Sequence, residues 1–121
     1  MSRFVIRTLS TGIKFDLKAT NGQTVASSEL YSARPACLRG ISSVRKNAPL
    51  ARVEDQTVEG WKSLPHPKFE LYQDRAGQYR FRLKATNGKI IAVSEGYGTR
   101  AACENGIQSV QVNAAEAELE E

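Results

Sequence analysis

The chain has 121 residues, and its 17 Lys and Arg outnumber its 13 Asp and Glu to give a formal net charge of +4. With 40% hydrophobic and 25% charged residues, its composition is that of an ordinary globular domain, and no apolar run reaches the roughly 20 residues that a membrane span needs. One histidine and two cysteines supply too few ligands for most metal sites and for most histidine-based catalysis. The composition therefore predicts a cytoplasmic protein that needs no cofactor, metal or membrane.

Three strands are predicted in the first 30 residues. The first covers residues 4–7 and is followed by a turn at Gly12. Charged and apolar side chains alternate over residues 14–19, which is the pattern of a strand with one buried face. Asn21-Gly22 favours a type I′ turn, because both positions of that turn need a positive φ, and a third strand is expected over 23–29.

A helix is predicted next, because apolar residues recur at every third or fourth position. Ser32 is the expected N-cap, and Pro35 suits a first turn in which no amide donor is needed. Gly40 interrupts the helix interior and indicates a close approach to the sheet. A short last strand is expected over 51–54. The buried stripe of the helix consists of Cys37, Ile41, Val44 and Ala48.

The second half of the chain repeats the first. The run Lys18–Gly22 returns unchanged as Lys84–Gly88, 66 residues later, and the matches extend through the helix. Residues 3–55 and 67–120 are therefore two copies of one βββαβ unit, joined by a linker at 56–66. The second copy has expected strands at 69–72, 79–85, 89–95 and 115–120, and a helix with Thr99 as N-cap, Gly106 in its interior and a stripe of Cys103, Ile107, Val110 and Ala114.

Two such units complete each other. A unit with one helix cannot cover its sheet alone, so we expect the copies to lie side by side. The prediction is an α+β fold with one mainly antiparallel sheet, both helices on one face, and a single integrated domain over residues 1–121.

The second copy also carries a string of short motifs, namely Lys68–Tyr72, Tyr79–Ala85, Asn87-Gly88, Ser94–Tyr97 and Asn105–Ile107. In this string the chain resembles the YegP-like family, which is a domain of unknown function. The resemblance implies tandem units or dimers of single units that form one sheet and exchange their last strands. A tandem chain is then expected to be a monomer, since its second repeat replaces the second subunit of a homodimer. The resemblance implies no activity, cofactor or catalytic residue.

The outward side chains of the two second strands are mostly basic, with Asp16 the exception. We call this patch the basic face. It predicts a non-enzymatic binding or accessory module whose partner is an anionic macromolecule, either nucleic acid or acidic protein. The same pattern is also typical of a solvated sheet face. The basic face consists of Lys14, Lys18, Arg80, Arg82 and Lys84.

An alternative function places a small-ligand or catalytic site at the junction between the repeats. Glu29 and Tyr31 precede the first helix, and Glu95 and Tyr97 precede the second. A carboxylate near a phenol suits proton transfer, and a duplicated fold brings such pairs near its pseudo-twofold axis. The structural interpretation is that the carboxylate lies near a helix N-terminus and that the Tyr ring packs under the loop.

The remaining reactive side chains predict structural roles. Cys37 and Cys103 lie at equivalent places on the apolar stripes and have no Cys-x-x-Cys spacing, so we expect buried, reduced thiols. His66, between two prolines of the linker, is expected in solvent. Trp61 is expected to anchor the linker on the core.

Overall fold

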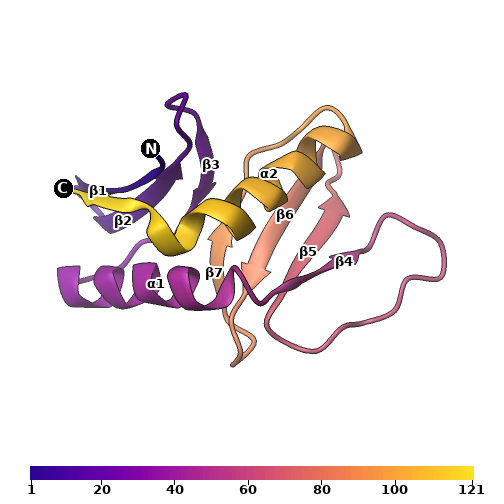
Figure 1. Cartoon of the computed structure of the whole chain (residues 1–121), viewed down its shortest axis with the longest axis horizontal. Helices are drawn as coiled ribbons and strands as arrows, with labels where there is room; N and C mark the ends of the chain where they lie inside the picture. The colour runs from indigo at the N-terminus through magenta and orange to yellow at the C-terminus, as the bar shows by residue number, and fades with distance from the viewer.

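A computed structural model describes all 121 residues and contains one eight-stranded sheet with two helices (Figure 1). The strand order is β4-β5-β6-β7-β3-β2-β1-β8. The elements are β1 (Arg3–Leu9), β2 (Gly12–Lys18), β3 (Thr24–Ser27), α1 (Arg34–Asn47), β4 (Arg52–Asp55), β5 (Lys68–Gln73), β6 (Tyr79–Lys84), β7 (Ile90–Val93), α2 (Arg100–Asn113), a 3₁₀ turn (Ala114–Glu116) and β8 (Glu118–Glu120).

The two repeats exchange their last strands. β4 of the first repeat pairs in parallel with β5 of the second, and β8 of the second pairs in parallel with β1 of the first. All other pairings are antiparallel, and the two halves of the sheet meet where Ser27 of β3 pairs with Val93 of β7. The predicted α+β fold, with one mainly antiparallel sheet and exchanged strands, is therefore confirmed.

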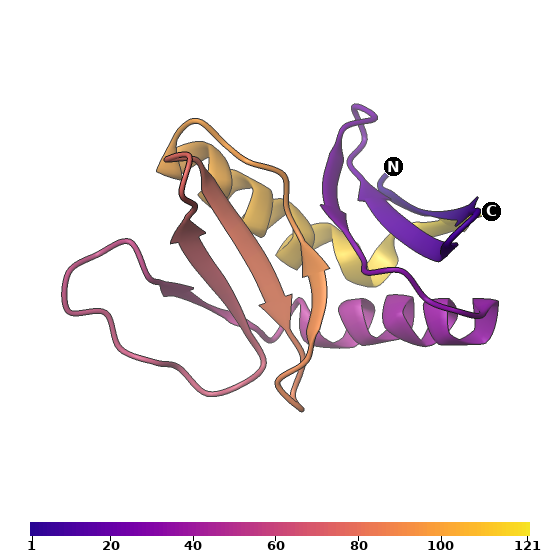
Figure 2. The same ribbon diagram turned by 180° about the vertical axis from the view of Figure 1, so that it is seen from behind.

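Both helices cover the same face of the sheet, and each helix reaches across the junction (Figures 1 and 2). α1 packs on β2 of its own repeat and on β7 of the other, while α2 packs on β5, β6 and β3. The opposite face carries no helix. Neither helix is both long and apolar enough to cross a membrane.

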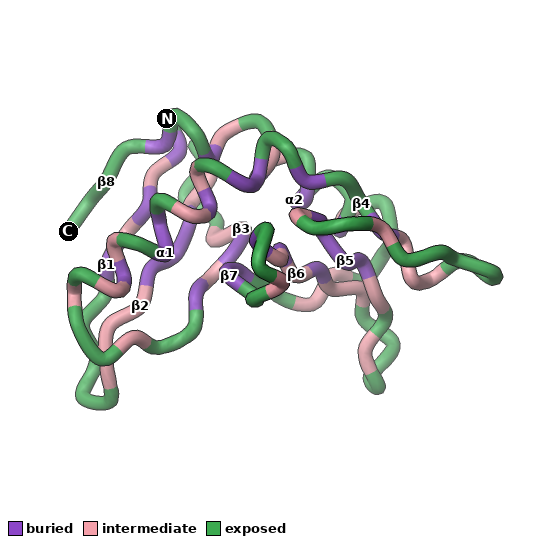
Figure 3. Tube along the Cα trace, turned by 90° about the horizontal axis from the view of Figure 1, so that it is seen from below, coloured by how far each residue is buried: buried purple, intermediate pink, exposed green.

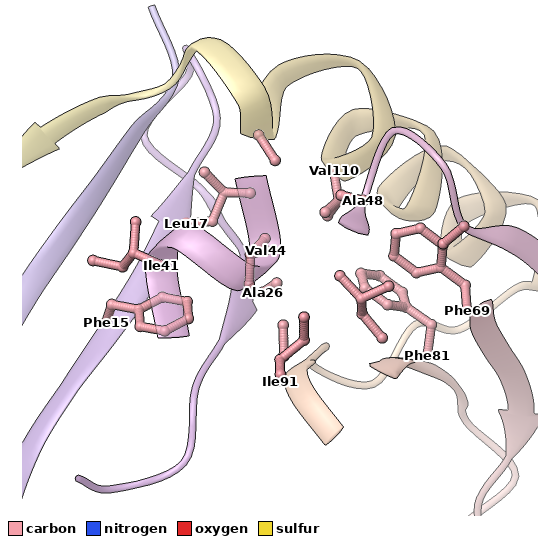
Figure 4. Close-up of a cluster of buried hydrophobic side chains, with 14 of the residues drawn as sticks. Phe15, Leu17, Ala26, Ile41, Val44, Ala48, Phe69, Phe81, Ile91 and Val110 are labelled. Atoms are coloured by element: carbon pink, nitrogen blue, oxygen red, sulfur yellow. The ribbon is translucent and has the colours of Figure 1, made fainter. Parts of the chain in front are cut away.

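The core lies between the helices and the sheet and draws on both repeats (Figures 3 and 4). Phe4 and Phe15 meet edge to face with ring centroids 5.6 Å apart, and Phe69 and Phe81 do the same at 5.8 Å. All four rings are fully buried, and burying a side chain of this kind stabilises the fold by about 1.5–3 kcal/mol. The predicted helix stripes, including both cysteines, are also buried.

A β-bulge in each repeat explains the apolar third strands. Leu83 pairs with Ala92 but Lys84 pairs with Ile90, so Ile91 is the extra residue, and β2 and β3 show the same shift around Val25. The bulge turns Ile91 and Ala92 both toward the core and leaves Ile90 and Val93 about 40% exposed. Sequence alternation alone assumes a regular strand and cannot assign the faces of Ile90–Val93. The third strands are also shorter than the predicted 23–29 and 89–95.

The element ends required three corrections. The N-cap of α1 is Ala33, which has no side-chain acceptor, rather than Ser32. Its counterpart Thr99 does cap α2, where the hydroxyl accepts a hydrogen bond from the Ala102 N–H at 3.1 Å. The first repeat's last strand is Arg52–Asp55, one residue later than predicted, and β8 starts only at Glu118 because the 3₁₀ turn occupies the preceding residues.

Candidate functional site

Figure 2 shows the sheet from the side that carries no helix. Strand register and burial place the five residues of the basic face on that surface. Register shows this directly: Leu83 and Phe69 are paired and buried in the core, so the adjacent pair of Arg82 and Glu70 points the other way. Lys18 follows the buried Leu17 in the same manner. The strands therefore present their basic side chains as one surface, as alternation predicted.

Every basic side chain of β6 has a carboxylate partner. Arg80 Nε lies 2.6 Å from Asp74 Oδ2, Arg82 Nε lies 2.5 Å from Glu70 Oε1, and Lys84 Nζ lies 3.2 Å from Glu70 Oε2. The Glu70 side chain is only 5% exposed, whereas that of Arg82 is 31% exposed. The anion is thus covered and the cations remain at the surface. Both arginines bond their carboxylates through Nε, and their Nη groups form no hydrogen bond within the chain.

The first repeat has a simpler arrangement on this face. Arg7 Nε lies 2.7 Å from Asp16 Oδ2, and the Ser27 hydroxyl donates to Asp16 Oδ1 at 2.7 Å. Asp16 faces outward as predicted but is buried beneath Arg7 rather than solvated. Lys14 and Lys18 form no ion pair.

A buried ion cluster lies beside the basic face at the seam between β4 and β5. Lys68 Nζ lies 2.7 Å from Glu54 Oε1 and 3.3 Å from Glu70 Oε2, and all three side chains are nearly inaccessible. The linker covers them, because the Leu64 N–H donates to Glu54 Oε1 at 2.7 Å and the Ser63 hydroxyl lies 3.4 Å from Lys68 Nζ. Sequence reasoning missed this cluster, since its partners lie 14 residues apart and meet only through the strand exchange.

The cluster keeps its carboxylates ionised. Burial raises the pKa of Glu54, but hydrogen bonds from Lys68, Gln56 and the Leu64 N–H outweigh it and bring the pKa down to about 2. Burial likewise opposes the hydrogen bonds from Arg82, Lys84 and Lys68, which together lower the pKa of Glu70. The hydrogen bond to Glu54 raises the pKa of Lys68 against its burial. The charges therefore hold one another in place at neutral pH.

The junction tyrosines pack within their own repeats. The Tyr31 ring lies parallel to Phe15 with centroids 6.4 Å apart, and its hydroxyl lies over Gly40. A Cβ at Gly40 would collide with that hydroxyl, so the helix glycine makes room for the tyrosine rather than for the sheet backbone. The second repeat repeats this arrangement with Tyr97, Phe81 and Gly106 at a centroid distance of 6.5 Å.

The phenols are poorly suited to act as bases. Burial, with smaller contributions from Glu29 and Cys37, raises the pKa of Tyr31, and burial with Cys103 and Glu95 does the same for Tyr97. Glu95 and Tyr97 do line a cavity of about 270 Å³ with Gln23, Thr24 and Val25 of the other repeat. Tyr31 and Glu29 are not part of its wall. That the four residues form a ligand or catalytic site stays a prediction.

The other reactive residues divide between core and surface. Both cysteines are fully buried, and burial first, then Glu104 and Asp55, raises the pKa of Cys103 to about 11. His66 is exposed, and its ring lies alongside Gly88. Trp61 is 44% exposed, so the prediction that it anchors the linker on the core is wrong. The linker is instead held by hydrogen bonds from the Leu64 N–H to Glu54 and between Ser63 and Lys68. Hydropathy does not indicate polar anchors of this kind.

Two clefts related by the repeat lie on the helix side. In each, the Lys-Ala-Thr-Asn-Gly turn of one repeat faces the helix of the other. The α1 cleft, of about 330 Å³, lies between α1 and the β6–β7 turn and includes Arg39, Ser43 and Asn87. The α2 cleft, of about 280 Å³, lies between α2 and the β2–β3 turn and includes the equivalent residues Asn105, Ser109 and Asn21. The longest run shared by the repeats thus forms one wall of both clefts.

The comparisons with known proteins agree with this architecture. The model of the domain of unknown function DUF1508 matches residues 11–55 and 74–121, which is one match for each repeat. The chain belongs to the DUF1508 family. The resemblance to YegP-like proteins is thereby confirmed.

Three relatives illustrate the family. A UPF0339 protein of Pseudomonas aeruginosa is 38% identical over 105 residues, which are 87% of this chain and 82% of that protein. The solution structure of YegP from Escherichia coli, a protein of unknown function, has a TM-score of 0.80 and 32% identity and covers 98% of this chain and 90% of that one. A UPF0339 protein of Methanosarcina acetivorans is 58% identical over 52 residues, which are 43% of this chain but 90% of that protein. A single repeat therefore accounts for most of a whole relative.

Proposed function

We propose that the protein is a small, non-enzymatic binding module that acts in the cytoplasm as a monomer and holds a nucleic-acid backbone on its basic face. The observation that carries the proposal is the layering of charge on this face. Asp16 and Glu70 are buried, while the cations above them keep between a quarter and a half of their side-chain surface exposed. A partner therefore meets positive charge and hydrogen-bond donors.

The ion pairs also fix the side chains of two arginines and leave some of their donors available for phosphate. Arg80 and Arg82 use Nε on their carboxylates, which leaves the paired Nη donors for a second anion. The Arg82 guanidinium lies 4.5 Å from the centre of the Tyr72 ring, which further fixes it. Alternate residues on a strand lie about 6.6 Å apart, so Arg80, Arg82 and Lys84 form a row that suits a linear polyanion. Contacts of this kind carry no base sequence preference.

Fluorescence anisotropy with labelled single-stranded and duplex oligonucleotides across a salt series tests the proposal. We expect binding at low salt that weakens as salt rises, because each phosphate contact releases counterions. Lys14→Glu with Lys18→Glu should reduce the salt slope by roughly 1 to 2, and because neither lysine has an ion-pair partner the fold should be retained. Lys62→Glu with Lys89→Glu is the matched control, with the same charge change in the linker and a turn.

Absence of binding at low salt would overturn the proposal, as would equal weakening by the control pair. Displacement of the oligonucleotide by polyglutamate at equal charge concentration would instead indicate an acidic protein as the partner.

A further inference from the structure

The α1 cleft differs from its counterpart in charge. Arg39 and Lys46 lie two helical turns apart on one side of α1, about 10 Å along its axis. Neither residue forms an ion pair, and α1 contains no acidic residue. The other two basic residues of α1 are engaged, since Arg34 pairs with Glu121 and Arg45 donates to the Ala115 carbonyl.

The fold does not need these two cations. At the same positions α2 carries Asn105 and Val112, yet both helices run for 14 residues and end in the same way. In both, an asparagine in the last turn donates from Nδ2 to a serine one turn earlier: Asn47 to the Ser43 carbonyl at 2.8 Å and Asn113 to the Ser109 carbonyl at 2.9 Å. The cations are therefore an addition to one copy of a common scaffold.

Two polar side chains of the α1 cleft, Asn87 and Ser43, each keep a hydrogen-bond donor free. Asn87 Oδ1 accepts from the Lys89 N–H at 3.0 Å, so its Nδ2 amide has no partner within the chain. The Ser43 hydroxyl accepts from Asn47 at 3.1 Å, which leaves its own O–H to donate. Thr86 Oγ1 donates to Asn47 Oδ1 at 3.0 Å, and this bond ties the turn of one repeat to the helix of the other. The oxygens of Asn87 and Ser43 thus accept a hydrogen bond within the chain while their donors remain available, and an anion needs donors of this kind.

We propose that the α1 cleft binds a small molecule with a diphosphate group, held by Arg39 and Lys46 and by the Ser43 hydroxyl and the Asn87 amide. Two cations match two anionic groups, and the volume lies within the range of small-ligand sites. This site is on the helix side of the sheet and is independent of the basic face. The α2 cleft, which has the same turn but neither cation, is expected to remain empty.

Titration of the ¹⁵N-labelled protein with inorganic pyrophosphate and with ADP, followed by amide chemical shifts, tests the proposal. We expect saturable shifts at residues 39–47 and 85–89 but not at the equivalent residues 105–113 and 19–23. Sodium sulfate at the same ionic strength is the reference, and it should shift these amides much less. Equal affinity for sulfate would overturn the diphosphate assignment.

Two reciprocal variants sharpen the test. Arg39→Asn with Lys46→Val gives α1 the residues that α2 carries at these two positions, and it should weaken pyrophosphate binding by about tenfold or more. Asn105→Arg with Val112→Lys should add a second set of shifts at the α2 cleft. Unchanged affinity in the first variant would overturn the proposal. So would shifts that map only to the basic face. The salt-series measurement with oligonucleotides remains the separate test of nucleic-acid binding there.

Discussion

The two seams formed by strand exchange have equivalent backbones and different surroundings. At the β4–β5 seam, Lys68 lies 2.7 Å from Glu54, and their side chains are 6% and 1% exposed. At the β1–β8 seam the equivalent residues are Arg3 and Glu120, which lie 3.4 Å apart with side chains 36% and 57% exposed. The register is the same in both seams. One repeat unit thus provides both a buried and an exposed version of the same ion pair.

The linker accounts for the difference. It passes over the β4–β5 seam and donates the Leu64 N–H to Glu54, so the carboxylate loses water but gains protein hydrogen bonds. A buried ion pair of this kind is costly to break, because removal of one partner leaves the other charge uncompensated. An exposed pair contributes little, because water and salt screen it. The linker therefore concentrates electrostatic stabilisation at one seam.

The largest expected effect is at the buried seam. Lys68→Met should lower the free energy of unfolding by roughly 3 kcal/mol, since the buried Glu54 then has no cation beside it while Glu70 keeps Arg82 and Lys84, whereas Arg3→Met should cost less than about 1 kcal/mol. Urea unfolding measures both. If the predicted single domain over residues 1–121 unfolds as one unit, Trp61 fluorescence and circular dichroism will give the same midpoint. Equal losses for the two variants would contradict the contrast between the seams.

The glycines inside the two helices have equivalent surroundings, so their substitution should cost a similar free energy of unfolding in both repeats. A Cβ at Gly106 would lie 2.5 Å from the Tyr97 hydroxyl oxygen and 3.2 Å from Phe81 Cε2. Gly106→Ala should therefore destabilise the protein by roughly 2 kcal/mol through overpacking, and Gly40→Ala by a similar amount. Thermal unfolding of each variant measures this. A stabilised variant at either position, as helix propensity alone would give, would show that the tyrosine moves aside.

The acid limb of the stability curve should report on the carboxylate buried at the β4–β5 seam. The folded-state pKa of Glu54 is about 2, below its ordinary value of 4.5, so its contribution is present above pH 4.5 and is lost as the pH falls toward 2. Each pH unit in this window removes about 1 kcal/mol or slightly more from this group. Glu54→Gln should flatten the pH dependence of urea unfolding between pH 5 and about pH 3. An equally steep curve in Glu54→Gln would contradict the assignment.

Most of the framework could be predicted from the residues themselves. The second strands alternate, so the buried Phe15 and Leu17 and the outward Lys14 and Lys18 follow from a period of two. The third strands could not be oriented in this way, because the bulge places Ile91 and Ala92 on one face. A bulge is an extra residue in a pairing, and pairing is not visible within a single strand.

Of the candidate sites, the basic face could be predicted from the sequence and the α1 cleft could not. The basic face was found from alternation, but the carboxylates that hold its arginines are contributed by β5 and by the turn after it. The α1 cleft was not predicted, because Arg39 and Asn87 are separated by 47 intervening residues and belong to different repeats. A charged residue on a helix does not indicate a binding site until the element that packs opposite it is known.

The sequence by itself determined the repeat, the βββαβ unit and which side chains of the second strands and helices face the core, because periodicity is a local property. The turn type was not determined, since Gly22 and Gly88 have positive φ but Asn21 and Asn87 do not. Tertiary structure alone decided which strands pair across the repeats, which ion pair the linker buries and which cations meet a cleft. Those outcomes depend on groups that are remote in the chain. When such groups pack together they exclude water, and the lower local dielectric strengthens the interaction between their charges.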